Sequence, residues 1–198
     1  MWGGTDTVDK IAWPQKSPYE QNIEKARALM TEAGYEDGFE VPLSFNLSHA
    51  DWAEPAALLI QQGLADIGIK ATIEKIPGAN WRTVALVDKK LPPHLENFGG
   101  WLNTQDNYFF WAYIKGNLFN SSNYANSEMA RLVDDTLDMA TDDLDYAPNV
   151  KRMIELAFDD IPRIPLWQPT LNVAFKESVE GYEYWFHRQM DVRALKPA

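Results

Sequence analysis

The sequence predicts an α/β domain because two alternating strands flank an amphipathic helix, and further amphipathic helices lie on either side of this unit. The first strand covers residues 39–48 and the second residues 69–74, and in both of them apolar and polar side chains alternate. The helix between them runs from about 52 to 67. Such a strand–helix–strand unit predicts two parallel strands joined by a right-handed crossover.

The elements before the helix follow from turn residues and periodicity. Residues 1–18 carry early glycines and two prolines, which predicts an extended loop. A helix is predicted over about 20–33, and Gly34 supplies its stop. In the first strand, Pro42 cannot donate a ladder hydrogen bond, so we expect its nitrogen to face an edge or the start of the strand.

The helix over 52–67 has a predicted cap and a predicted buried face. Asp51 is expected to cap it, with Glu54 in a capping-box-like position, and Gly68 to end it. The apolar stripe that should face the sheet comprises Ala56, Leu59, Ile60, Gly63, Leu64 and Ile67.

The second half of the chain predicts further elements in order. A short helix is predicted over 79–88, a third strand near 94–99 and a loop over 101–111. Two helices follow, one carrying Met129 to Ala140 and the other carrying Val150 to Phe158, with Pro148 in the first turn of the second. A strand is predicted near 171–175, before an aromatic tail.

Composition excludes several classes of function. The formal charge of −11 repels phosphate backbones and argues against nucleic-acid binding. The chain has no cysteine, which excludes disulfides, thiolate nucleophiles and Cys-ligated zinc. No apolar run approaches the roughly 18 residues that span a bilayer, and the N-terminus has no signal-peptide pattern. The acidic run over 142–145 is interpreted as a solvated loop.

The predicted loop from Trp101 to Trp111 is the main candidate site for a small solute. It follows the carboxyl end of a predicted strand, where ligands bind in α/β sheets. Gly99 and Gly100, which precede the loop, permit unusual backbone angles. Its aromatic faces can pack on a solute, and its amides and its one carboxylate can hydrogen-bond to polar groups. The alternative is that these aromatic residues are core and the amides form turns, and Phe109 and Phe110 in particular are expected in the core. The candidate ligand-binding residues are Trp101, Asn103, Gln105, Asp106, Asn107 and, from the helix over 79–88, Trp81.

Metal and catalytic chemistry have little support in the sequence. None of His49, His94 and His187 has metal-ligand spacing to another histidine, so no metal site and no cofactor are expected. No nucleotide-binding or hydrolase motif occurs. The remaining enzymatic alternative is a glycoside hydrolase that uses Glu96 and Asp106 as its carboxylate pair.

The order of several segments resembles family 5 of the extracellular solute-binding proteins, the dipeptide, oligopeptide and nickel receptors of ABC importers. The resemblance covers nearly the whole chain. The segments that carry it are Glu24–Tyr35 with Asp37–Val41, Gln61–Lys70, Phe98–Trp101, Asn120–Asn126 and Ile164–Pro169.

The resemblance implies one lobe of a periplasmic-binding-protein-like (type II) fold, with a mixed sheet flanked by helices. Residues 1–170 would form the C-terminal ligand-binding lobe, and residues 171–198 would return toward an N-terminal lobe that this chain lacks. The implied function is non-catalytic solute recognition, in the periplasm or on the cell surface, with permease subunits of the importer as partners. Since a solute is enclosed between two lobes, we expect this chain alone to bind it weakly.

In dipeptide-binding members of the family, an aspartate in the corresponding loop captures the amino group of the ligand. Asp106 is the only acid in this loop, and the earlier acid and the proline of the family pattern are missing, which argues against dipeptide specificity. A longer peptide, an opine-like compound or an oligosaccharide stays open, and nickel is less favoured.

The resemblance implies that the aromatic tail packs on the N-terminal lobe, which this chain lacks, so the apolar side chains of the tail are expected to lack that contact. Its apolar groups should fold back on this lobe or pair with a second copy of the chain. They are Val173, Phe175, Tyr182, Tyr184, Trp185 and Phe186.

Overall fold

A computed structural model describes residues 18–99, 102, 104–167, 172–183 and 190–198. The chain divides into two compact units. The described residues of 18–97 and 118–123 form the first, which we call the sheet unit. The described residues of 98–117 and 124–198 form the second, which we call the helical unit.

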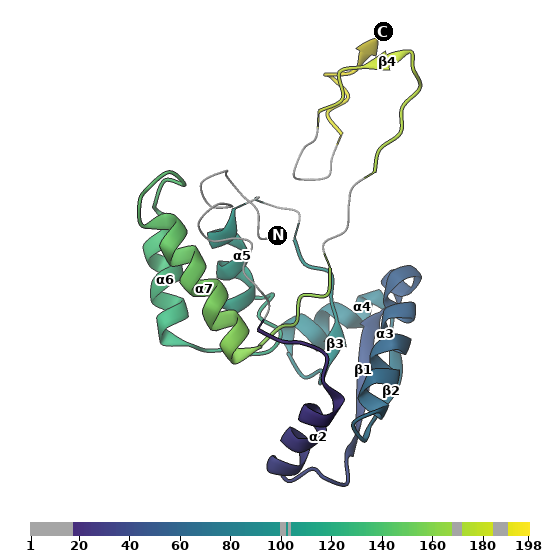
Figure 1. The fold of residues 1–198 in the computed structure, drawn as a ribbon. Coiled ribbons are helices and arrows are strands. Elements are labelled where there is room, and N and C mark those ends of the chain that lie inside the picture. The colour runs from purple at the N-terminus through teal and green to yellow at the C-terminus, as the bar shows by residue number, and fades with distance from the viewer. Residues whose placement is uncertain (1–17, 100–101, 103, 168–171, 184–189) are drawn as a thin grey trace. The chain divides into compact units, whose positions relative to one another are not determined.

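The sheet unit contains the predicted strand–helix–strand arrangement (Figure 1). In chain order its elements are α2 (Ile23–Glu32), β1 (Phe39–Asn46), the 3-10 turn η1 (Leu47–His49), α3 (Ala50–Ala65), β2 (Ile69–Ile76), α4 (Gly78–Trp81), the π-helical turn η2 (Arg82–Val87) and β3 (His94–Leu95).

The three strands form a parallel sheet in the order β2-β1-β3, which confirms the predicted parallel pairing. Strand β1 pairs with β2 over its whole length, from Phe39 opposite Ile69 to Asn46 opposite Ile76. Strand β3 pairs with β1 only opposite Ser44 and Phe45, so Pro42 lies in a stretch of β1 with a described neighbour on one side. Within the described chain, antiparallel pairing occurs in a separate two-stranded sheet.

Helix α3 packs on the sheet through small residues. Ala53 and Ala57 are fully buried with Leu43 and Phe45, whereas Leu59 is 73% exposed. The predicted stripe was therefore wrong at Leu59 and at Gly63, which is also exposed. The reason is that alanine lets a helix axis approach a sheet closely, and this close approach decides which face is buried.

Two boundary predictions were also wrong. Helix α3 begins after η1 with His49 at the N-cap position, and Asp51 lies inside the first turn. An acid there still favours the helix through its dipole. The third strand is limited to His94–Leu95, because only these residues find partners on β1.

Gly38 turns the chain from α2 into β1 and should be the least replaceable residue of this turn. Its φ is +73°, and a Cβ atom would lie 1.9 Å from the carbonyl oxygen of Gly68. Gly34 has a similar φ of +80° with nothing within 4 Å, so it is a matched control. We expect Gly34→Ala to cost about 1 kcal/mol and Gly38→Ala about 2 kcal/mol or more, measured by hydrogen exchange of the β1 amides. Equal costs would contradict the close approach.

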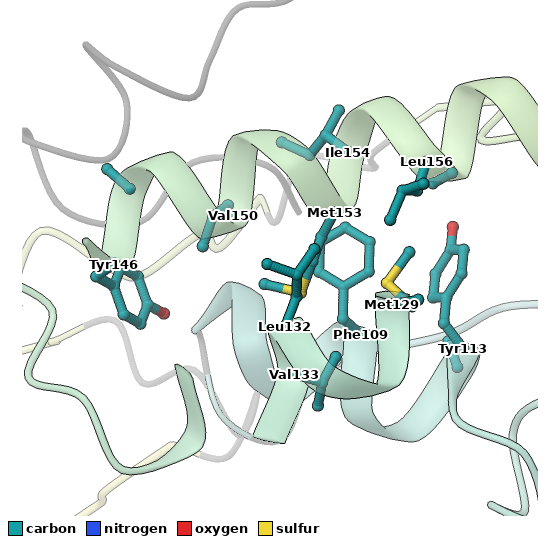
Figure 2. Close-up of a cluster of buried hydrophobic side chains, with 13 residues drawn as sticks. Phe109, Tyr113, Met129, Leu132, Val133, Tyr146, Val150, Met153, Ile154 and Leu156 are labelled. Carbon is teal, nitrogen blue, oxygen red and sulfur yellow. The ribbon is translucent and has the colours of Figure 1, made fainter. Parts of the chain in front are cut away.

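The helical unit contains three helices that pack on one another around a single core (Figures 1 and 2). Its elements are α5 (Gln105–Tyr113), α6 (Ser127–Leu137), α7 (Tyr146–Asp160) and the short strands β4 (Val179–Glu180) and β5 (Lys196–Pro197). The core residues Phe109, Met129 and Met153 are at most 1% exposed. Figure 2 shows their side chains meeting between the helices.

The start of α6 is tied to the end of α7 by a polar cluster. Asn126 caps α6, because its side-chain oxygen accepts hydrogen bonds from the backbone of Glu128 and Met129. Its side-chain nitrogen donates to Asp160 at 2.9 Å, and the hydroxyl of Tyr124 donates to the same carboxylate oxygen at 2.6 Å. Both hydrogen bonds favour the ionised acid.

These hydrogen bonds, first that from Tyr124 and then that from Asn126, lower the pKa of Asp160. A folded-state pKa below the unfolded value of about 3.9 gives stability that is present above that pH and is lost as pH falls through the folded pKa. Asp160→Asn should therefore flatten the acid dependence of the urea midpoint between pH 6 and pH 3. The change should be small because the carboxylate is exposed. Asp159→Asn is the matched control, and an identical flattening in it would contradict this role.

The tail forms an antiparallel ribbon of β4 and β5 rather than the expected strand near 171–175. Outside the paired strands of the ribbon, Phe175 packs on Tyr182 with ring centroids 4.9 Å apart, and Val173 is 43% exposed. Residues 184–186 lie outside the described residues, and the pairing of the tail with a second copy stays a prediction. Among the described helices, none has the length and apolar character needed to cross a membrane.

Candidate functional site

The candidate residues after the sheet belong to a helix rather than to the predicted loop. Helix α5 begins at Gln105, so Gln105, Asp106 and Asn107 form its first turn, with Thr104 at the N-cap position. The loop prediction was wrong from Gln105 onward. The buried residues Gln105, Phe109, Ala112 and Tyr113 recur at helical spacing, and their burial outweighs the modest helix propensity of aromatic residues.

The loop that precedes α5 is only partly described. Trp101 and Asn103 lie outside the described residues. Gly99 has a φ of +129°, a value that glycine tolerates, as expected for this loop. A Cβ atom at this position would lie 3.0 Å from the ring of Tyr108, which in turn packs edge-on against Phe98.

Asp106 is held by a residue that the sequence reasoning missed. The hydroxyl of Tyr146, the first residue of α7, donates to Oδ1 of Asp106 at 2.5 Å. Tyr146 is 1% exposed, whereas Asp106 is partly exposed. A signal was present, because Tyr146 lies four residues before Val150 and thus extends the apolar stripe of α7 by one turn.

Burial, and after it the hydrogen bond and charge of the Asp106 carboxylate, raise the pKa of Tyr146 far above its ordinary value. The phenol therefore stays protonated and acts as a donor toward the carboxylate. Asp106 also lies in the first turn of α5, where the helix dipole favours negative charge.

Gln105 completes this buried cluster. Its amide oxygen lies 3.5 Å from the hydroxyl of Tyr146, and its amide nitrogen has no hydrogen-bond partner. A phenol has one proton, and the shorter contact gives it to Asp106. A half-turn of the terminal amide would let the nitrogen of Gln105 donate to the Tyr146 oxygen, and the three side chains would then form one chain of hydrogen bonds.

Asn107 presents a buried donor at the same helix end. Its side-chain nitrogen is inaccessible to solvent and has no hydrogen-bond partner, although the residue as a whole is partly exposed. Leaving such a donor unsatisfied costs about 1–3 kcal/mol. An acceptor atom brought within reach of this nitrogen would remove the cost.

Trp81 lies in the sheet unit and is 6% exposed. It packs with Ala85 and Leu86, and its ring meets the ring of His94 edge-on at 5.6 Å. It is thus part of a packed cluster near the carboxyl end of β2 and the start of β3.

His94 belongs to a partly buried polar group in the sheet unit. Its Nδ1 lies 3.0 Å from the Pro92 carbonyl oxygen and its Nε2 lies 3.2 Å from the hydroxyl of Ser121, which donates to Glu96 at 3.3 Å. Glu96 and Asp106, the two acids of the hydrolase alternative, therefore each accept a hydrogen bond from a hydroxyl group. Among the described residues, no group of three or more metal-ligating side chains is placed to hold a metal ion.

Comparison with known proteins identifies relatives of this chain. A sequence model described as "Bacterial extracellular solute-binding proteins, family 5 Middle" matches residues 3–120. The oligopeptide-binding protein AppA of Bacillus subtilis (strain 168) is 28% identical over an alignment of 185 residues, and the match covers 84% of this chain and 33% of AppA. The chain thus spans about a third of the length of this relative.

Solved structures share the fold. HbpA2 from Haemophilus parasuis matches with a TM-score of 0.72 at 20% identity, over 95% of this chain and 38% of HbpA2. The clavulanic acid biosynthesis oligopeptide binding protein 2 matches with a TM-score of 0.76 at 19% identity, over 89% of this chain and 34% of that protein. At these identities the likeness concerns the fold alone.

Proposed function

Because the chain belongs to family 5 of the bacterial extracellular solute-binding proteins, we propose that it forms one lobe of a receptor that binds a peptide-like solute for an ABC importer without transforming it. The match of residues 3–120 to this family carries the proposal. The coverage of AppA, about a third, supports a single lobe of a larger receptor.

In this proposal residues 1–170 form the ligand-binding lobe and residues 171–198 return toward the other lobe. The exposed side chains of Val173 and Phe175 support a partner surface for the return segment. The receptor would work outside the cytoplasmic membrane, in the periplasm or on the cell surface, and deliver its solute to the permease subunits of the importer.

The proposed solute-contacting residues are Trp101, Asn103, Gln105, Asp106, Asn107 and Trp81. The described geometry supports two of them most directly. Asp106 is a partly exposed carboxylate at the start of α5, which suits an ammonium group. Asn107 has a buried side-chain nitrogen without an acceptor, which suits a carbonyl or carboxylate oxygen. A peptide supplies both kinds of group.

A peptide is favoured as the solute because the relative AppA is named as an oligopeptide-binding protein. Calorimetric titration of the full-length protein with tri-alanine and with maltotriose tests this choice. We expect heat of binding with tri-alanine and none with maltotriose. Binding of maltotriose alone would replace the peptide by an oligosaccharide, and hydrolysis of maltotriose would overturn the non-catalytic assignment.

A further inference from the structure

The hydroxyl of Tyr146 donates a hydrogen bond to the carboxylate of Asp106, and the packing around the tyrosine holds this donor in place. Tyr146 is 1% exposed and belongs, with Val150, to the core shared by α5, α6 and α7 (Figure 2). Its hydroxyl donates to Oδ1 of Asp106 at 2.5 Å. A phenol packed in a core cannot turn away as water can, so its hydrogen bond fixes the direction of the carboxylate.

We propose that Tyr146 is a positioning residue of the solute site, which holds Asp106 so that its second oxygen receives the ammonium group of the solute. The inference rests on the proposed function, in which Asp106 contacts the solute. Tyr146 itself is buried and acts only through Asp106.

The chemistry of the pair supports this division of roles. Two helices that start at Gln105 and Tyr146 bring their first turns together here, and the hydrogen bond spans 40 residues of sequence. One carboxylate oxygen is committed to the phenol, which leaves the other for a charge-assisted hydrogen bond. Because burial and then Asp106 raise the pKa of Tyr146, the phenol keeps its proton and acts as the donor in this hydrogen bond.

A purely structural role makes a different prediction from a positioning role. If the hydrogen bond only joined α5 to α7, its loss would weaken the binding of every solute to the same degree. If the hydrogen bond orients Asp106 toward the solute, its loss weakens the binding only of solutes that carry a free amino group. The ratio of two affinities therefore separates the two roles.

The experiment measures Kd of the full-length protein for tri-alanine and for N-acetyl-tri-alanine by calorimetry. The wild-type protein should bind tri-alanine, which has a free amino group, more tightly than N-acetyl-tri-alanine. Tyr146→Phe removes only the hydroxyl and should lower this preference about tenfold, as expected for a hydrogen bond to a charged group, while the Kd for the acetylated peptide stays within about twofold. In the Asp106→Asn background, Tyr146→Phe should change the preference no further.

Tyr113→Phe is the matched control, because Tyr113 lies in the same core and is 7% exposed. This variant should keep the wild-type preference. Equal weakening of both peptides by Tyr146→Phe, or a preference still intact, would overturn the positioning role and leave the proposed function standing. Failure of wild type to bind either peptide would overturn the proposed function and the inference with it.

Discussion

Replacement of Phe109 by alanine is expected to lower the free energy of unfolding of the helical unit by about 3–5 kcal/mol. Phe109 is 1% exposed and lies at the centre of the core between α5, α6 and α7 (Figure 2). Its ring also packs on that of Tyr113, with centroids 5.0 Å apart. The truncation removes the transfer free energy of the ring and leaves a cavity that rigid helices cannot fill.

Hydrogen exchange of the α6 and α7 amides is the suitable measurement, because a chain of two compact units need not unfold in one step. Leu144→Ala is the control, since Leu144 is 91% exposed and its loss should change stability by less than about 0.5 kcal/mol. A cost below about 1 kcal/mol for Phe109→Ala would show that α5 is not anchored through this ring.

The second large effect concerns the chain on its own. We expect the 198-residue chain to bind tri-alanine at least about a hundredfold more weakly than the full-length protein. Solute pockets bury most of their ligand, and one lobe can cover only one side of it. Returning roughly 150 Å² of apolar solute surface to water costs about 3–4 kcal/mol.

Calorimetry of the two proteins under identical conditions makes this comparison. The isolated chain must first be shown to be folded, by circular dichroism and by protection of its β1 amides. Equal affinity in the folded chain and the full-length protein would contradict the two-lobed site.

The sequence predicted the strand–helix–strand unit because strands and helices differ in the period of their apolar residues. The alternation in β1 and β2 was strong, and the parallel pairing followed from the length of the connection. The buried face of α3 was harder to predict, since hydrophobicity alone favours Leu59 over Ala53 and Ala57. Only the distance between helix and sheet decides that choice.

The candidate site was predicted less well than the fold. Asp106 was found because it is the one acid in its segment, but its helical setting was missed, since aromatic residues and amides are weak helix formers. Tyr146 was missed because its partner is 40 residues away. No local pattern can indicate a hydrogen bond between the first turns of two separate helices.

Native mass spectrometry of the full-length protein tests the central claim most directly. The protein would be incubated with a mixture of short peptides and separated from unbound peptide, and the mass of the intact complex would then be measured. We predict an added mass that is released unchanged on denaturation and fragments as a peptide. The mass of the empty protein alone, or an added sugar or metal ion in place of a peptide, would contradict the account.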